Sequence, residues 1–365
     1  MALKLGIIGF PACGKTSLFN AVTGSNHPVG QYATTPTQTL AVMRVPDPRM
    51  DKLKAMYNPK SFVLAHVDCL DFAGLISGTG GGGREFKGEL MGKLREVDAI
   101  VHVVRAFESA DVPHVLETVD PRRDLAETNS ELLFADLYQC EARIQKLKHQ
   151  VSKTNSKTLE ADRKELATLE KIHALLEAGK SVHDFHTEHE DEKKHVAAFQ
   201  FLTEKKQVVV FNVGEGDLAP GGKGEALQKE FPGSLALSAK IEMEIGQLPP
   251  DERAGFLQDL GIAEPAAARL ARQAYAALNA ISFFTVGEDE VRAWTIQKGD
   301  HAVTAAGKIH TDLAKGFVRA EVFGYDELMA LGSEKALKAA GKVRLEGKEY
   351  IVRDGEIVHI RANTR

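Results

Sequence analysis

The sequence contains little cysteine, a single tryptophan, no long apolar run and no excess of positive charge. Its three cysteines, Cys13, Cys69 and Cys140, are widely spaced and form no metal-ligand pattern. Because no apolar signal stretch opens the sequence either, this cysteine usage indicates a reducing compartment, and we expect a cytoplasmic protein. No segment has the apolar length needed to span a bilayer, so no membrane role is expected.

Charge and composition narrow the class of protein further. A formal net charge of −5 provides no global basic field, so any nucleic-acid contact must come from a local patch, and no DNA partner is expected. The 365 residues are 43% hydrophobic and 27% charged, which is typical of a soluble globular chain long enough for two or three domains.

A complete phosphate-binding motif stands near the start of the chain. Residues 9–16 read Gly-Phe-Pro-Ala-Cys-Gly-Lys-Thr, the pattern G-x-x-x-x-G-K-[ST], in which the lysine reaches the β- and γ-phosphates and the hydroxyl holds Mg²⁺. Residues 3–8 are typical of a buried strand, and residues 17–22 open a helix whose N-terminus attracts phosphate. A chance glycine turn is the alternative, but the flanking elements favour the motif. The predicted nucleotide-binding residues are Pro11, Ala12, Cys13, Gly14, Lys15, Thr16 and Ser17, with Lys15 also catalytic and Thr16 also a Mg²⁺ ligand.

Apolar runs and helical spacing predict the domain organisation. Residues 1–126 alternate short buried strands with helices, which indicates an α/β domain with a mostly parallel sheet. Residues 127–195 have the spacing of two long helices around a polar turn at 153–157, which predicts an antiparallel hairpin. Strand patterns resume over 196–278, so the hairpin is an insertion, and 279–365 has the texture of a small α+β domain. The predicted strands span 3–8, 63–70, 99–104, 207–211, 234–237, 281–286 and 292–296, and a helix is predicted over 325–332.

Two further segments are typical of the nucleotide sensors of switch proteins. Asp71 to Gly74 follow a strand and match the D-x-x-G sensor, in which the aspartate holds Mg²⁺ through water and the glycine amide hydrogen-bonds the γ-phosphate. The alternative is an ordinary strand-end turn, which the preceding phosphate motif disfavours. In the polar run between the two motifs a threonine is expected to bind Mg²⁺; we prefer Thr35, with Thr34 and Thr37 as alternatives.

The base-recognition loop departs from the guanine-specific pattern N-K-x-D. Asn212 is retained, Val213 replaces the lysine, and Glu215 replaces the aspartate. Residues 238–240 match the last turn that contacts the base, although each loop alone could be a simple strand end. The predicted nucleotide-binding residues in these two loops are Asn212, Val213, Glu215, Ser238, Ala239 and Lys240.

Together these motifs resemble the YchF family, an Obg-related branch of the translation-factor class of P-loop NTPases. The resemblance spans almost the full length and is carried by residues 9–16, 45–49, 71–75, 95–105, 120–121, 129–132, 135–137 and, most specifically, 305–312 and 316–321. It implies a GTPase-like domain with a coiled-coil insertion, a C-terminal TGS domain of β-grasp, ubiquitin-like fold, and association with the ribosome or ribosomal RNA. In this family the N-x-x-E form of the base loop goes with ATP, so the resemblance implies ATP, with GTP as the alternative, and Mg²⁺ as cofactor.

Several residues predict slow hydrolysis. The family usually has asparagine at Ala12, where it helps to coordinate a monovalent cation, so the basis for that aid is missing here. Leu75 stands where Ras-type enzymes have a water-positioning glutamine, so another group or a partner must activate the water. The glycine-rich run 78–84 predicts a mobile switch.

His114 matches a common family histidine and is predicted to reach the γ-phosphate after loop movement; the alternative is a surface-loop histidine.

Three functions remain open from the sequence. The preferred one is an ATP-hydrolysing switch that engages the ribosome; the others are a nucleotide-dependent binding module with negligible turnover and a conventional GTPase. Two weaker patterns accompany them. The histidines of 183–195 suit a metal site or, as we favour, a solvated linker, and the basic side chains of 143–157 suit RNA phosphates or a solvated helix face.

Overall fold

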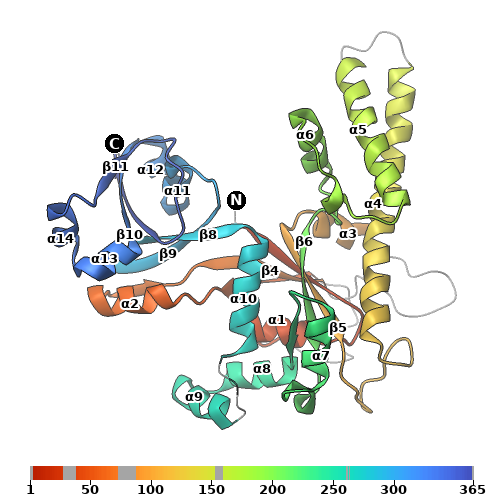
Figure 1. Ribbon diagram of the computed structural model, residues 1–365, viewed down its shortest axis with the longest axis horizontal. Helices are drawn as coiled ribbons and strands as arrows, with labels where there is room; N and C mark the ends of the chain where they lie inside the picture. The colour runs from red at the N-terminus through yellow and green to blue at the C-terminus, as the bar shows by residue number, and fades with distance from the viewer. Residues whose placement is uncertain are drawn as a thin grey trace. The chain divides into compact units, whose positions relative to one another are not determined.

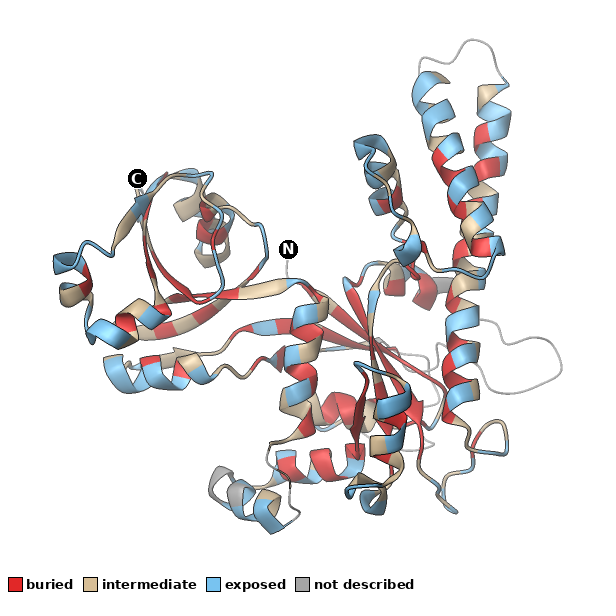
Figure 2. Cartoon of the chain, viewed as in Figure 1, coloured by how far each residue is buried: buried red, intermediate tan, exposed pale blue. Residues whose placement is uncertain are grey.

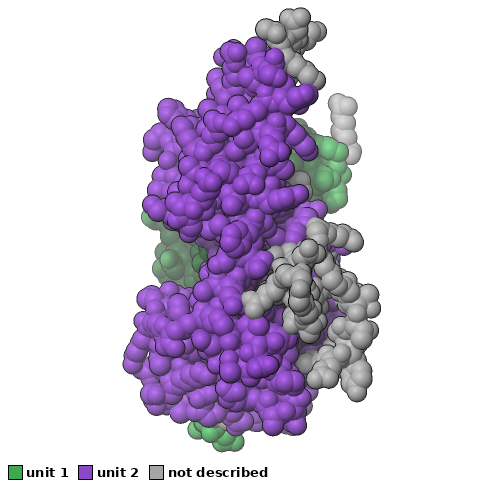
Figure 3. Space-filling model, turned by 90° about the vertical axis from the view of Figure 1, so that its right-hand side faces the viewer, with its two compact units in different colours: residues 1–3, 41–68, 257–365 green, residues 4–40, 69–256 purple. Residues whose placement is uncertain are grey.

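The computed structural model describes residues 3–27, 38–72, 88–152, 159–259, 262 and 264–363. The chain forms two compact units (Figure 3). Residues 4–40 and 69–256 make up the P-loop unit, and residues 1–3, 41–68 and 257–365 make up the C-terminal unit. Among the described residues, no helix is both long enough and apolar enough to cross a membrane.

A six-stranded sheet in the order β2-β4-β1-β5-β6-β7 contains the core of the P-loop unit (Figure 1). β1 pairs with β5, β5 with β6 and β6 with β7, all in parallel. Every residue of β5 is buried, as expected for a strand covered on both faces (Figure 2). The predicted α/β fold with a mostly parallel sheet is therefore confirmed. The strands are β1 (Lys4–Ile8), β2 (Gln38–Arg44), β4 (His66–Phe72), β5 (Ala99–Arg105), β6 (Lys206–Asn212) and β7 (Leu235–Leu237).

Two strands differ from the prediction. The predicted strand 63–70 is divided into β3 (Ser61–Val63), which belongs to the second sheet, and β4. β2 was not predicted at all. It lies at the edge of the sheet and exposes Leu40 and Val42, so it lacks the continuous apolar run by which buried strands are recognised.

The helices of the P-loop unit bring the ends of several loops together. α1 (Lys15–Thr23) contacts α8 (Ala239–Gln247), and each begins at a loop of the predicted site. α7 (Lys223–Glu230) packs on β7. α3 (Gly88–Arg95) contributes Leu90 and Leu94 to the core beside Ile8 and Phe72. The apolar core thus supports the C-terminal ends of the strands, where ligands bind in open α/β sheets.

The predicted helical hairpin consists of α4 (Pro121–Val151) and α5 (Leu159–Glu177), and α5 packs against the C-terminal part of the longer α4 (Figure 1). α4 begins before the predicted boundary at 127, because Asp120 accepts hydrogen bonds from the backbone N–H groups of Arg122 and Arg123 and so caps the helix. The predicted turn at 153–157 lies outside the described residues. The buried residues shared by the two helices are Cys140, Ile144, Leu147, Leu169, Ile172 and Leu176.

A buried carboxylate anchors the hairpin to the rest of the P-loop unit. Asp136 of α4 is fully buried and accepts hydrogen bonds from Arg95 Nη1 at 2.7 Å, from the backbone N–H of Leu202 at 3.0 Å, and from Thr203. Because a buried charge with this many partners is costly to disturb, the base of the hairpin is held rigidly.

The charged surface of the hairpin agrees with the solvated alternatives. No cluster of three or more metal-binding side chains occurs in the described part of the chain, so the histidines of 183–195 form no metal site there. Several cations of the hairpin are paired with carboxylates of a neighbouring helix: Arg143 with Glu165, and Lys148 with Glu170. These pairs reduce the positive charge that this face can offer to RNA phosphates.

The C-terminal unit contains a second, mixed sheet in the order β11-β10-β12-β8-β9-β3. Helix α11 (Ala302–Ile309) packs on β9 and β10. This is the arrangement expected of the predicted β-grasp domain. The predicted strands and the predicted helix appear as β8 (Ala280–Thr285), β9 (Glu290–Gln297) and α13 (Tyr325–Leu331); the remaining elements are β10 (Phe317–Gly324), β11 (Arg344–Glu346), β12 (Glu356–Ala362), α9 (Pro250–Asp259), α10 (Ala266–Ala277), α12 (Thr311–Lys315) and α14 (Glu334–Ala339).

The compact units do not follow the predicted domain boundaries, which stay a prediction: residues 41–68 lie in the C-terminal unit. β3 pairs in parallel with β9, so this early segment completes the second sheet. On α2 (Pro48–Tyr57), Arg49 donates to Asp354 Oδ2 at 2.7 Å and to Asp47 Oδ2 at 2.7 Å. Residues 257–278 lie in the C-terminal unit as well. Local sequence patterns carry no information on which distant strand a segment pairs with.

Candidate nucleotide-binding site

The phosphate loop connects β1 to α1 and has left-handed backbone at three positions. Gly9 has φ of 149°, Ala12 of 58° and Gly14 of 95°. Glycine is required at two of them by close approach as well: a Cβ on Gly9 would lie 2.2 Å from the carbonyl oxygen of Val103, and one on Gly14 would lie 2.1 Å from Asn212 Nδ2. The phosphate loop therefore packs closely against both β5 and the base-recognition loop.

Lys15 lies across the loop that precedes it. Its side chain is buried, and Nζ donates to the carbonyl oxygens of Gly9 at 2.9 Å and Phe10 at 2.7 Å. The ammonium group is thus held over the turn, where its charge reinforces the positive end of the α1 dipole. An anion bound in the loop can replace one of these carbonyl partners.

Thr16 and Asp71 form a pair suited to a hard cation. Thr16 Oγ1 donates to Asp71 Oδ2 at 2.9 Å, while Asp71 Oδ1 is buried and has no hydrogen-bond partner among the described residues. Burial raises the pKa of the Asp71 carboxyl, although the nearby charge of Lys15 lowers it. A buried oxygen without a partner is costly unless a cation or water satisfies it, so these residues fit Mg²⁺.

Two predicted sensor residues cannot be located. Gly74 and Thr35, together with the alternatives Thr34 and Thr37, lie outside the described residues, as do Leu75 and the glycine-rich run 78–84. Their predicted roles stay predictions.

Asn212 joins three of the predicted loops. Its Nδ2 donates to the carbonyl oxygen of Cys13 at 2.9 Å, and its Oδ1 accepts from the backbone N–H of Ala239 at 2.9 Å. The phosphate loop, the end of β6 and the start of α8 are therefore brought together by one buried amide. Asn212 accordingly holds the three loops together, and the second hydrogen of Nδ2 and the second lone pair of Oδ1 remain for a base.

The other predicted base-loop residues differ in exposure. Val213 and Ala239 are buried, and Ser238, which precedes the first residue of α8, is buried too. Glu215 and Lys240 are exposed beside them, where their side chains can meet a ligand.

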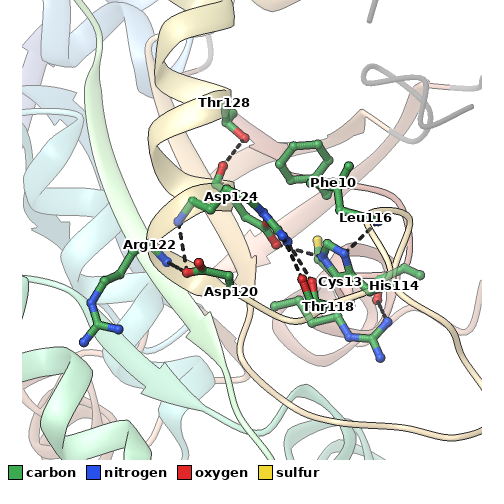
Figure 4. A network of polar contacts seen from close by, with 12 residues as sticks. Phe10, Cys13, His114, Leu116, Thr118, Asp120, Arg122, Asp124 and Thr128 are labelled. Atoms are coloured by element: carbon green, nitrogen blue, oxygen red, sulfur yellow. Dashed lines mark hydrogen bonds and ion pairs between the residues drawn. The ribbon is translucent and has the colours of Figure 1, made fainter. Parts of the chain in front are cut away.

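His114 is buried in a polar network instead of lying on a surface loop (Figure 4). Its Nδ1 accepts from the backbone N–H of Leu116 at 3.0 Å, which leaves the proton on Nε2, 2.7 Å from Asp124 Oδ2. Arg123 donates to the other oxygen of Asp124. The surface-loop alternative is wrong, and both ring nitrogens are occupied, so a catalytic role requires the loop to release the imidazole.

Arg105 is a residue of the site that the sequence reasoning missed. It ends the apolar strand β5, is fully buried, and donates through Nη2 to the carbonyl oxygen of Val112 at 2.7 Å, through Nε to that of Phe107 at 3.2 Å and through Nη1 to that of Ala12 at 3.5 Å. Burial lowers the pKa of its guanidinium. The available signal was an arginine at the C-terminal end of an otherwise apolar parallel strand, where ligands of such sheets bind.

A cavity of about 780 Å³ elsewhere in the P-loop unit is separate from this site. It is lined by residues of α3 and α4, including the exposed side chains of Phe134 and Tyr138, and by none of the predicted nucleotide-binding residues.

Comparisons with known proteins agree with this geometry. A family model described as a 50S ribosome-binding GTPase matches residues 4–138, and a model for the C-terminal region of YchF GTPases, described as a protein of unknown function, matches residues 280–363. The ribosome-binding ATPase YchF of Haemophilus ducreyi is 39% identical over 369 residues, and that of Bacillus subtilis is 38% identical over 371 residues; each alignment covers 100% of both chains.

Two eukaryotic relatives extend the comparison. Obg-like ATPase 1 of Oryza sativa is 37% identical over 99% of this chain and 92% of its own length. The solved structure of the Schizosaccharomyces pombe YchF GTPase matches with a TM-score of 0.85 and 34% identity, covering 99% of this chain and 98% of the other.

Proposed function

The chain belongs to the YchF family, and from this premise we propose that it is a Mg²⁺-dependent P-loop nucleoside triphosphatase switch that binds and slowly hydrolyses ATP and associates with the ribosome or its RNA. The observation that carries the proposal is the convergence of three loops on Asn212 beside the Thr16–Asp71 pair. The names of the relatives, ribosome-binding ATPase and Obg-like ATPase, support ATP as ligand and the ribosome as partner, and a ribosomal partner agrees with a cytoplasmic location.

Binding of the triphosphate follows from the loop geometry. Backbone N–H groups of residues 12–17 and the dipole of α1 meet the phosphate oxygens, and Lys15 exchanges a carbonyl partner for the β- and γ-phosphates. Thr16 and Asp71 are the described residues that would hold Mg²⁺, with Thr35 as the proposed third ligand. When bound, Mg²⁺ neutralises charge on the phosphates. Gly74 is proposed to sense the γ-phosphate.

Hydrolysis is proposed to be slow because the chain lacks the usual aids. Leu75 cannot polarise water, and Ala12 has no side-chain oxygen for a monovalent cation. These two residues also favour the second candidate, a binding module with negligible turnover. Multiple-turnover assays with and without purified ribosomes separate the two: product formation beyond one equivalent, accelerated by ribosomes, is the outcome expected of the switch.

Loss of the Thr16 hydroxyl is expected to make nucleotide binding insensitive to Mg²⁺. Thr16→Ala removes a cation ligand and a hydrogen-bond donor to Asp71, so ATP affinity in the presence of Mg²⁺ should fall by about tenfold or more, the equivalent of one charged hydrogen bond. Isothermal titration with Mg²⁺ and with EDTA measures this. Thr23→Ala is the matched control, because its hydroxyl donates to Phe19 within the same helix. Equal Mg²⁺ dependence in all three proteins would remove Thr16 from the metal site.

Base preference is expected to favour ATP at least as much as GTP. In guanine-specific sites an aspartate accepts from N1–H and the N2 amine of the base, and such bidentate pairs discriminate by roughly 1–3 kcal/mol. Glu215 has one more methylene, and Val213 lacks the lysine stem that packs over the purine. Glu215→Asp should therefore restore only part of the guanine preference, while Glu244→Asp, the same change at an exposed site on α8, should leave it unchanged.

Side-by-side titrations with ATP and GTP test this expectation. If the parent protein binds GTP tenfold or more tightly than ATP, about 1.4 kcal/mol, the conventional GTPase replaces our proposal while the switch fold stands.

Replacement of His114 is expected to slow hydrolysis without loss of binding. His114→Ala removes the imidazole, whereas Asp124→Ala keeps the imidazole and removes the carboxylate that binds both Nε2 and Arg123. If the histidine acts on the γ-phosphate after release, turnover falls in the first variant and is retained or raised in the second, with a loss of about 10²–10⁴-fold typical of acid–base groups. Equal turnover in His114→Ala and the parent protein would reduce His114 to a loop anchor.

A further inference from the structure

Arg105 is a buried cation whose hydrogen-bond partners are backbone carbonyls. Its three contacts are the carbonyl oxygens of Ala12, Phe107 and Val112, and the ring of Phe107 lies 4.4 Å below the guanidinium. No ion pair of Arg105 with a carboxylate is found among the described residues, and Glu108 and Asp124 influence it only through their charges. A buried charge compensated in this way is costly to retain, so a functional reason for it is expected.

The hydrogen bond to the Ala12 carbonyl fixes the direction in which the backbone N–H of Cys13 points. A trans peptide is planar, so its C=O and N–H point in opposite directions. A donor that holds the Ala12 carbonyl on the outside of the loop therefore turns the N–H of Cys13 toward the inside. Asn212 does the same for the next peptide, because it holds the Cys13 carbonyl and so turns the N–H of Gly14 inward. Two side chains from different strands thus orient two successive amides.

Ala12 needs such a restraint because its backbone is unfavourable. Its φ of 58° lies in the left-handed region, which costs a residue with a Cβ about 1–2 kcal/mol. Without an external partner the peptide can relax to a more favourable conformation, and the amide then leaves the position in which it meets a phosphate. At 3.5 Å the Arg105 contact is the longest of the three, so an anion arriving in the loop has room to tighten it.

The same guanidinium also holds the loop that carries His114. Val112 lies two residues before the histidine, and its carbonyl accepts the shortest of the Arg105 bonds. The planar guanidinium spreads its donors over three carbonyls at once, which a lysine ammonium on a flexible stem cannot reproduce.

We propose that Arg105 is a positioning residue of the nucleotide site: by holding the Ala12 carbonyl outward from the buried end of β5, it presents the Cys13 amide, and the attraction of its own charge, to the β-phosphate of the nucleotide. The inference rests on the proposed function, since it specifies how the proposed phosphate site is preorganised. The contribution of Arg105 to affinity should therefore depend on the number of phosphates of the nucleotide and not on its base.

The test compares ATP, ADP and AMP binding in the parent protein, Arg105→Lys, Arg105→Met and Arg253→Lys. Arg105→Lys keeps the charge and removes the fork. Arg253→Lys is the matched control, because Arg253 likewise donates to backbone carbonyls, those of Leu248 and Gly246, which lie outside the phosphate loop and the His114 network. Affinities are measured by calorimetry, and thermal unfolding is recorded for each variant.

We expect Arg105→Lys to lower the affinities for ATP and ADP by about tenfold each. The affinity for AMP, which lacks the β-phosphate, should fall by less than about twofold. Arg105→Met, which also removes the charge, should weaken ATP and ADP further. If Arg105 is merely structural, the affinities for all three nucleotides fall by the same factor as the unfolding temperature falls. An unchanged ratio of ADP affinity to AMP affinity in Arg105→Lys overturns the inference. Should Arg105→Met fail to fold, the lysine variant alone decides. A parent protein that binds no triphosphate contradicts the proposed function instead.

Discussion

Lys15→Ala is expected to weaken ATP binding by about 100-fold or more while the protein remains folded. In the structure the ammonium group donates to two carbonyl oxygens, those of Gly9 and Phe10. Binding therefore exchanges neutral partners for charged ones. Two charged hydrogen bonds of roughly 1.5–3 kcal/mol each, less the carbonyl bonds given up, leave about 3 kcal/mol, which corresponds to ~100-fold in affinity.

The matched control for this variant is Lys4→Ala. Lys4 lies on the preceding strand and makes only a partly exposed ion pair with Glu96 at 3.5 Å, which contributes little to stability. Calorimetric titration of both variants with Mg²⁺ and ATP gives the comparison. An alanine variant at position 15 that binds ATP within threefold of the parent protein would remove the phosphate site from residues 9–16.

Gly9→Ala is expected to destabilise the P-loop unit by about 3 kcal/mol or more. The new Cβ would lie 2.2 Å from the carbonyl oxygen of Val103 and 2.9 Å from Cys13 Sγ. The first of these neighbours is backbone in the middle of β5, which cannot move without breaking its pairing with β1 and β6. The clash adds to the backbone cost of about 1–2 kcal/mol at a φ of 149°.

Gly24→Ala separates the clash from the backbone cost. Gly24 ends α1 with φ of 70°, and an added Cβ there would meet nothing within 4 Å. It should therefore lose only the backbone contribution, about 1 kcal/mol. Because the chain has two compact units, amide hydrogen exchange of β1 and β5 is the suitable readout, since it reports the opening of this sheet alone. Equal protection in the two variants would falsify the close packing of Gly9 on β5.

The parts of the site that the sequence predicts are those whose geometry is local. Residues 9–16 specify their own turn, because glycine is needed where the backbone is left-handed and lysine and threonine follow at fixed positions in the next helix. The buried strands β1, β5 and β6 can be recognised in the sequence by their continuous apolar runs. For the same reason the order of strands and helices predicts a parallel α/β sheet before any distance is known.

What could not be predicted depends on contacts between distant residues. Asn212 meets Cys13 across 199 residues, and Arg49 meets Asp354 across 305 residues, so neither pairing leaves a pattern in a local window. The sequence left His114 open between a role at the γ-phosphate and a place on a surface loop, and it did not show the hydrogen bonds to Asp124 and Leu116 that bury the ring. From the sequence, Arg105 is only a residue at the end of an apolar run. Its role depends on the directions of carbonyl groups in two loops, which no local pattern shows.

The pairing of β3 with β9 has a consequence for the order in which the chain acquires its structure during synthesis. Lys60 and Asp289, at the start of this pairing, are 229 residues apart. At about 5–20 residues per second, the ribosome needs on the order of 10–50 s to make the intervening chain. Through that interval β3 has emerged without its partner strand, although β2 and β4 on either side of it in the sequence belong to the first sheet. The first sheet can therefore begin to form while β3 is still unpaired, and the second sheet cannot take up β3 until β9 has been made.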